Sequence, residues 1–197
     1  MKKILILGSN SFSGSCLVNF LLKKNFHVIG CSKSHPSEKK FNCLHSLKSK
    51  KIKKFSFIKI DINKNFKKLE KIIAKNKPSI IVDFLGQGMV PESWKYPYLT
   101  FNTTLLSKIR LYEFLKKQKF LKKYIKISTP EVFGSGNITN SKFDRYNPST
   151  PYALSHSSIE SYLSLLYKQF SFPVIISRFA NFYGPYQKLY RLIPLAI

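Results

Sequence analysis

Cysteine, arginine and acidic residues are scarce in this 197-residue chain, and each shortage bears on the class of protein it can be. Cys16, Cys31 and Cys43 have neither metal-ligand spacing nor an even count, so we expect reduced thiols, no metal site and a cytoplasmic location. No apolar run reaches the roughly 18 residues that span a bilayer, and the first run breaks at Gly8 and Ser9. The sequence therefore predicts neither a membrane anchor nor a signal peptide.

The few acidic residues leave the chain strongly basic. Nine Asp and Glu face 34 Lys and Arg, which gives a formal net charge of +25. Such a charge attracts phosphate groups and is typical of proteins that bind nucleic acids. Only four of the basic residues are arginines, however, and the arginine fork is what phosphate and base-edge recognition tends to use. A basic nucleic-acid binder is therefore the third hypothesis, behind two that the motifs favour.

Short apolar runs alternate with helical patterns along almost the whole chain. We expect strands at residues 3–7, 27–31, 55–60, 80–85, 124–128 and 174–178. We expect helices after residue 12, at about 66–75, at about 97–117 and from residue 151 onward. This alternation predicts an α/β fold with a doubly wound parallel sheet, Rossmann-like, in one domain over residues 1–197.

A glycine-serine turn lies between the first expected strand and the first expected helix. It has the G-x-x-G-x-x-G spacing from Gly8 to Gly14, with Ser11 in place of the middle glycine. A turn at a helix N-terminus directs backbone N–H groups and the helix dipole toward a pyrophosphate. An ordinary turn is the alternative, and the Ser11 side chain is expected to weaken binding. The predicted cofactor contacts are Gly8, Asn10, Ser11, Phe12, Ser13 and Gly14.

The end of the second expected strand bears on the choice between NAD and NADP. An acidic residue there would accept from the ribose 2′-hydroxyl and favour NAD, but the sequence reads Cys31-Ser32-Lys33-Ser34. Ser32 and Lys33 are suited to hold a 2′-phosphate, so the sequence favours NADP without excluding NAD. Because lysine is so abundant, Lys33 is equally explained as a solvated surface residue.

Further blocks occur in the order typical of extended short-chain dehydrogenase/reductases. They are Asp61-Ile62, Asp83-Phe84-Leu85-Gly86-Gln87, Asn102 and the segments 128–134, 151–156 and 178–185. Together with the turn at Gly8, they make the chain resemble the NAD-dependent epimerase/dehydratase family of nucleotide-sugar enzymes. The resemblance covers essentially the whole chain. It implies a protein truncated before the C-terminal substrate domain of that family.

The resemblance also implies roles for individual residues. Tyr152 would take the proton of a sugar hydroxyl while hydride passes to the nicotinamide, with His156 and Glu131 beside it. An exposed carboxylate without a role is the alternative for Glu131. The remaining implied contacts are Asp61 and Ile62 to adenine, Leu85, Gly86, Gln87 and Asn102 to the cofactor, and Thr129 and Asn181 to a nucleotide-sugar substrate.

Two positions depart from the family pattern. A tyrosine of pKa about 10 needs a nearby cation to act as a base at neutral pH, and the family's lysine is His156 here. Three interpretations of His156 stay open: a working substitute that donates to the cofactor ribose, a mark of lost catalysis, or a structural residue. The aspartate that acts as general acid in sugar 4,6-dehydratases is Pro130, which leaves epimerase, reductase or decarboxylase chemistry open.

Two functional hypotheses follow. The first is an NAD(P)-dependent nucleotide-sugar epimerase/dehydratase-like enzyme. The second is a catalytically impaired or truncated dinucleotide-binding module. Because family members commonly pair through two long helices, the resemblance also implies a homodimer through the helices near 97–117 and 151–170.

Overall fold

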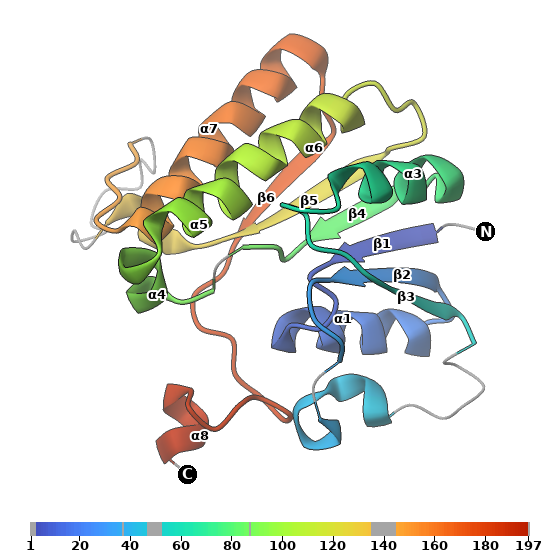
Figure 1. The fold of residues 1–197 in the computed structure, drawn as a ribbon, viewed down its shortest axis with the longest axis vertical. Coiled ribbons are helices and arrows are strands. Elements are labelled where there is room, and N and C mark those ends of the chain that lie inside the picture. Colours follow the sequence, from blue (N-terminus) through green and yellow to red (C-terminus); the bar gives the residue numbers. More distant parts are fainter. Residues whose placement is uncertain (1–2, 37, 47–52, 87, 135–144, 197) are drawn as a thin grey trace. The chain divides into compact units, whose positions relative to one another are not determined.

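The computed structural model describes residues 3–36, 38–46, 53–86, 88–134 and 145–196. They form two compact units (Figure 1). The first unit lies within residues 1–84 and 181–197, and the second comprises residues 85–180. Both units combine parallel strands with helices.

The first unit is built on four parallel strands in the order β3-β2-β1-β4. In the central strand, Leu5 lies opposite Ile29 on one side and Ile81 on the other. Nearly all residues of β1 and β2 are buried, because both faces of the sheet are covered, and this explains their continuous apolar runs. The strands are β1 Lys3–Leu7, β2 His27–Ser32, β3 Phe55–Lys59 and β4 Ile80–Asp83.

Two helices cover these four strands, with α1 (Phe12–Lys23) and α3 (Phe66–Asn76) on opposite sides of them (Figure 1). The buried residues of α3 are Phe66, Leu69 and Ile73, which the helical repeat places on one face. Shorter helical elements complete the unit: η1 Lys39–Phe41, η2 Cys43–Ser46 and α8 Leu192–Ala196.

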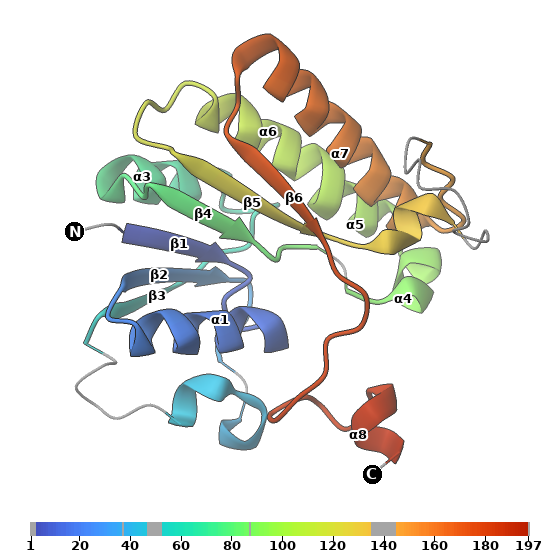
Figure 2. The same cartoon turned by 180° about the vertical axis from the view of Figure 1, so that it is seen from behind.

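The second unit contains the parallel pair β5 (Lys123–Ser128) and β6 (Val174–Arg178), in which Ser128 lies opposite Arg178. Helix α7 (Pro151–Phe170) runs beside a second helical column that faces the same two strands (Figure 2). That column is α5 Pro97–Phe101, the π-helical η3 Asn102–Leu106 and α6 Ser107–Leu115. The other elements are α4 Val90–Lys95 and the 3-10 turn η4 Pro130–Phe133.

All six expected strands are present, with ends that differ from the expected ones by at most two residues. The expected helix at 97–117 is present as the continuous column α5-η3-α6, interrupted only by the change to π-helical hydrogen bonding. Helix α4 was not predicted. None of the helices within the described residues is long and apolar enough to cross a bilayer.

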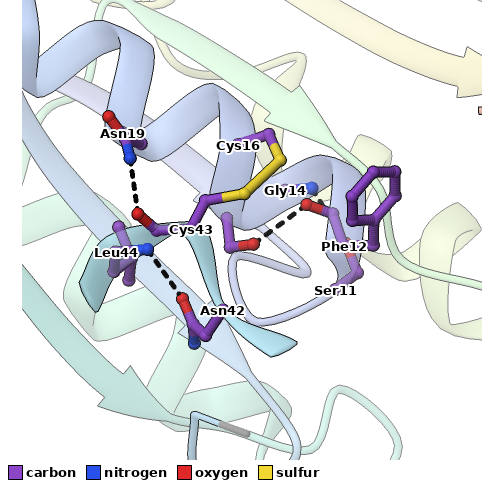
Figure 3. Close-up of a disulfide and its surroundings, with 9 residues drawn as sticks. Ser11, Phe12, Gly14, Cys16, Asn19, Asn42, Cys43 and Leu44 are labelled. Atoms are coloured by element: carbon purple, nitrogen blue, oxygen red, sulfur yellow. Dashed lines mark hydrogen bonds between the residues drawn. A yellow bond between two sulfur atoms is a disulfide. The ribbon is translucent and has the colours of Figure 1, made fainter. Parts of the chain in front are cut away.

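The cysteines differ from expectation. Cys16 of α1 and Cys43 of η2 form a disulfide, with Cα atoms 5.3 Å apart (Figure 3). Asn19, one turn further along α1, donates to the Cys43 carbonyl oxygen at 2.5 Å and joins the same two segments. The expectation of three reduced thiols is therefore wrong for this pair, because the return of η2 to α1 across 27 residues has no signature in cysteine spacing. Cys31 is a free buried thiol, and burial raises its pKa to about 12.

Candidate functional site

The turn after β1 depends on both of its outer glycines. Gly8 has a φ of +79°, which favours glycine, and a Cβ there would lie 3.0 Å from the Cβ of Phe84. The Gly8 N–H donates to the Cys31 carbonyl oxygen at 2.7 Å and ties the turn to β2. A Cβ on Gly14 would lie only 2.2 Å from the Gly8 carbonyl oxygen. Helix α1 can therefore approach the turn this closely only with glycine at position 14.

Ser11, which replaces the middle glycine of the motif, caps helix α1. Its Oγ accepts from the Gly14 N–H at 3.0 Å and donates to the Gly8 carbonyl oxygen at 2.8 Å. The side chain is thus turned back onto the turn, where such a cap stabilises a helix by about 1 kcal/mol. The first amides of α1, those of Phe12 and Ser13, have no intrahelical acceptor, as in any helix. These two N–H groups suit an anion.

The residues expected near the adenosine lie together at the ends of β2 and β3. Ser32 is buried, and its Oγ accepts from the Asn10 N–H at 2.9 Å, which holds the turn to β2. Lys33 is exposed, and its Nζ lies 4.0 Å from the Oδ2 of Asp61. Ile62 is buried beside Asp61. The hydroxyl of Ser32 therefore already serves the turn, and the charge of Lys33 faces a carboxylate.

In the second unit, Tyr152 and His156 lie one turn apart on the same face of α7. The helix begins at Pro151, and the Oγ1 of Thr150 caps it by accepting from the Ala153 N–H at 3.0 Å. Tyr152 is therefore in the first turn, where the helix dipole favours negative charge. The ring centroids of Tyr152 and His156 are 4.6 Å apart, with His156 buried and Tyr152 partly exposed.

The buried ring of His156 has cations near it. Its Nδ1 lies 3.4 Å from the Nζ of Lys126 and 3.2 Å from the Oγ of Ser128. Lys108 of α6 is also buried, and its Nζ donates to the Leu85 carbonyl oxygen. Burial first, and then the charges of Lys126 and Lys108, lower the pKa of His156 well below its usual value of 6.5. His156 is therefore neutral at neutral pH and does not itself supply the cation that the tyrosine needs.

A buried carboxylate, Glu160, lies one turn beyond His156 on α7. Its Oε2 accepts from the Arg178 Nε at 3.0 Å, the Arg178 Nη2 at 2.5 Å and the Tyr146 hydroxyl at 2.9 Å. Its Oε1 accepts from the Ser128 hydroxyl. Sequence reasoning missed this cluster, although an acidic residue four positions after His156 places both on one helix face. The cluster holds β5, β6 and α7 together around His156.

The segment after β4 passes the other side of the His156 ring. A Cβ on Gly86 would lie 3.5 Å from the Oγ1 of Thr104 and 3.7 Å from the Nε2 of His156. The Thr104 Oγ1 is buried and has no hydrogen-bond partner within the described part of the chain. Because an unpaired buried hydroxyl costs free energy, this atom is suited to a polar ligand that completes the site. Gln87, expected nearby, lies outside the described residues.

Comparison with known proteins identifies the family. The family model for GDP-mannose 4,6 dehydratase matches residues 5–197. The chain belongs to this family. It is 33% identical over 208 residues to the dTDP-D-glucose 4,6-dehydratase of Dictyostelium discoideum, covering 98% of this chain and 47% of that protein. The dTDP-D-glucose 4,6-dehydratase of Homo sapiens is 28% identical, and the match covers 98% of this chain and 55% of that protein. The chain thus spans about half the length of these relatives.

Solved structures of the family confirm the expected Rossmann-like doubly wound parallel fold. The dTDP-glucose 4,6-dehydratase of Bacillus anthracis, in complex with NAD, matches with a TM-score of 0.77 and 27% identity, over 99% of this chain and 60% of that one. The UDP-glucuronic acid 4-epimerase of Bacillus cereus, in complex with UDP-glucuronic acid and NAD, matches with a TM-score of 0.79 and 28% identity. The match covers 98% of this chain and 60% of that one. The resemblance inferred from the ordered sequence blocks is therefore confirmed.

The other expected site residues of this family member lie in several elements. Thr129 is buried and caps η4, with its Oγ1 accepting from the Glu131 N–H at 3.2 Å. Desolvation raises the pKa of Glu131, and Pro130 is the first residue of η4. Asn102 is the first residue of η3, and Asn181 is exposed in the first unit. Their roles stay predictions.

Lowering the pH below about 6.5 is expected to destabilise the protein through His156. In the unfolded chain this histidine takes up a proton near pH 6.5, whereas its lowered pKa keeps the folded form neutral. The unfolded state then binds the extra proton, so the free energy of unfolding falls by up to about 1.4 kcal/mol per pH unit. Above pH 6.5 the effect vanishes. Urea unfolding between pH 7.5 and 5.5 measures this slope.

A His156→Gln variant should lose this part of the pH dependence. The matched control is His35→Gln, because His35 is exposed and should leave the slope nearly unchanged. An identical slope in the wild type and in His156→Gln would show that His156 titrates alike in both states.

Proposed function

We propose that this chain is the cofactor-binding part of a nucleotide-sugar-modifying enzyme in which Tyr152 accepts the proton of a sugar hydroxyl. The observation that carries the proposal is the placement of Tyr152 in the first turn of α7, in ring contact with His156, whose Nδ1 lies 3.4 Å from the Nζ of the buried Lys126. A helix N-terminus and a nearby cation both stabilise a phenolate. The bound nicotinamide would accept the hydride from the sugar carbon that carries this hydroxyl.

The residues present fit a dinucleotide. The Phe12 and Ser13 amides at the start of α1 would hold the pyrophosphate, since Ser11 directs its own side chain back onto the turn. The unpartnered Oγ1 of Thr104 beside Gly86 would bind a polar group of the cofactor. The other proposed cofactor contacts are Gly8, Asn10, Gly14, Ser32, Lys33, Asp61, Ile62, Leu85, Gln87, Asn102, Tyr152 and His156.

Two observations favour NAD over NADP. Ser32 is buried and engaged with the Asn10 amide, and Lys33 lies near the carboxylate of Asp61, so neither group stands ready for a 2′-phosphate. The solved structures of two relatives are complexes with NAD. We therefore propose NAD, against the preference for NADP that the absence of an acidic residue at the end of β2 suggested.

The proposed substrate is a nucleoside diphosphate sugar, as the names of the relatives indicate for those proteins. Thr129 and Asn181 would contact the sugar. Desolvation raises the pKa of Glu131, which would donate or accept a proton close to the sugar. We further propose a homodimer through α5-η3-α6 and α7, which carry exposed large apolar side chains. These are Tyr98, Leu106, Leu165, Tyr167 and Phe170. A cytoplasmic location stays a prediction.

Calorimetric titration with NAD and NADP, followed by incubation with a panel of nucleotide sugars, tests the proposal. We expect saturable NAD binding and a keto-sugar product, which hydroxylamine would trap for mass spectrometry. NAD binding without turnover of any sugar would instead support a dinucleotide-binding module without catalysis. Binding of neither cofactor, together with steeply salt-dependent binding of nucleic acid, would favour the third hypothesis.

A further inference from the structure

Strand β5 carries a lysine at an inward position. Its residues alternate between buried and partly exposed positions, and Lys126 is fully buried between Tyr124 and Ser128. The Lys126 Nζ donates to the Ile127 carbonyl oxygen and lies 3.4 Å from the Nδ1 of His156. Lysine is almost never fully buried unless its charge has a function or a partner, because desolvating an ammonium group is costly. An aliphatic side chain would suit this position better for stability alone.

We propose that Lys126 is a positioning residue for the Tyr152 site: its ammonium group donates to Nδ1 of His156, fixes the Nε2–H tautomer and supplies the positive charge that His156 lacks. This inference rests on the proposed function of Tyr152. It assigns to two residues, on a strand and on a helix, the tasks that the family pattern gives to one lysine on the helix.

The tautomer follows from the donors available. An ammonium group has only donors, so its contact with Nδ1 is a hydrogen bond only if Nδ1 is the acceptor. Ser128, the other neighbour of Nδ1, gives its single proton to Glu160, so its Oγ can only accept from Nδ1 and competes with Lys126 for that atom. With Nδ1 accepting from Lys126, the ring proton lies on Nε2. A charged donor also makes the stronger hydrogen bond of the two.

The Nε2–H group then lies beside Gly86, one of the proposed cofactor contacts of the second unit. The Nε2 would lie 3.7 Å from a Cβ on Gly86, and the same Cβ would lie 3.5 Å from the unpartnered Thr104 Oγ1. A donor and a hydroxyl group thus converge beside Gly86. In the family pattern, the lysine at position 156 would donate to the cofactor ribose and also carry the positive charge. Here the Nε2–H of His156 would be the donor, and Lys126 would provide the positive charge.

The charged groups around His156 come from three elements. Lys126 of β5 and Lys108 of α6 are the cations that lower its pKa, and Glu160 of α7 approaches it through Ser128. Glu160 is paired with Arg178, and this pairing limits how far its charge offsets the two lysines. The positive charge around His156, the ring neighbour of Tyr152, therefore comes from lysines outside α7.

Nitrogen-15 NMR of the histidine side chains in the cofactor-free protein tests the tautomer directly. We expect a protonated Nε2 and an unprotonated Nδ1 for His156 at pH 7. Replacing the ammonium group in Lys126→Met should raise the pKa of His156 and mix the two tautomers. The matched control is Lys123→Met, because Lys123 is exposed on the same strand. A wild-type His156 protonated on Nδ1, or an unchanged pKa in Lys126→Met, would overturn the inference.

A charge-exchange variant tests the functional part. Lys126→Met should lower keto-sugar formation at least tenfold, and Lys126→Met combined with His156→Lys should recover most of it, because the cation returns to α7. His156→Lys alone should not raise the rate, since it places two ammonium groups near each other. Failure of the double variant to recover activity would contradict the inference.

The two proposals fail in different ways. If the wild-type protein neither binds NAD nor converts a sugar, the proposed function fails, whereas the NMR result still decides whether Lys126 sets the tautomer of His156. If NAD binds and turnover occurs but His156 carries its proton on Nδ1, only the further inference fails. Methionine has a flexible unbranched side chain that adapts to a buried position, so Lys126→Met is expected to fold.

Discussion

Replacement of Tyr152 by phenylalanine is expected to lower keto-sugar formation by about 10²–10⁴-fold, the usual contribution of a general base. The variant lacks only the phenolic oxygen, and the ring contact with His156 at a centroid distance of 4.6 Å can persist. The helix start, capped by Thr150, does not depend on the hydroxyl group. Binding of NAD and thermal stability are therefore expected to change little. Product formation and calorimetric titration measure the two effects separately.

The matched control for Tyr152→Phe is Tyr96→Phe, because Tyr96 is exposed and belongs neither to the proposed site nor to the proposed dimer surface. It should leave both turnover and cofactor binding unchanged. Equal turnover in Tyr152→Phe and the wild type would remove Tyr152 from the reaction and would require another group to accept the sugar proton.

Replacement of Gly14 by alanine is expected to weaken NAD binding more than tenfold and to lower the free energy of unfolding by about 3 kcal/mol. The new Cβ would lie 2.2 Å from the Gly8 carbonyl oxygen and 2.8 Å from the Oγ of Ser11. The carbonyl oxygen belongs to the backbone of the turn and cannot rotate aside as a side chain can. Either α1 or the turn must move, and the Ser11 cap and the first amides of α1 move with it. Urea unfolding and NAD titration measure both effects.

Gly88→Ala is the control for Gly14→Ala, because a Cβ on Gly88 would meet no atom within 4 Å. It should change stability by less than about 0.5 kcal/mol, as is usual for a surface substitution. If the two alanine variants were equally stable and bound NAD equally well, the close approach of α1 to the turn would not be required.

Most of the secondary structure could be predicted because it depends on local patterns. The apolar runs of β1 and β4, the Pro151 start of α7 and the glycine-serine turn each report a backbone preference within a few residues. Helix α4 was missed, since it spans only six residues, too few to show a helical period. The position of Ser11 in the motif was predicted from the sequence, but the cap that its side chain forms on α1 was not.

The sequence by itself determined the fold class, the order of the strands and helices, the turn at Gly8 and the pair Tyr152 and His156, because each depends on residues that are neighbours along the chain. Only the tertiary structure decided the charge around that pair. Lys126 is 30 residues from His156, and no local pattern distinguishes an inward lysine from the many solvated ones. Burial keeps His156 neutral, and the contact between α1 and η2 brings Cys16 and Cys43 together as a disulfide. Desolvation and contacts between distant segments exist only once the chain is folded.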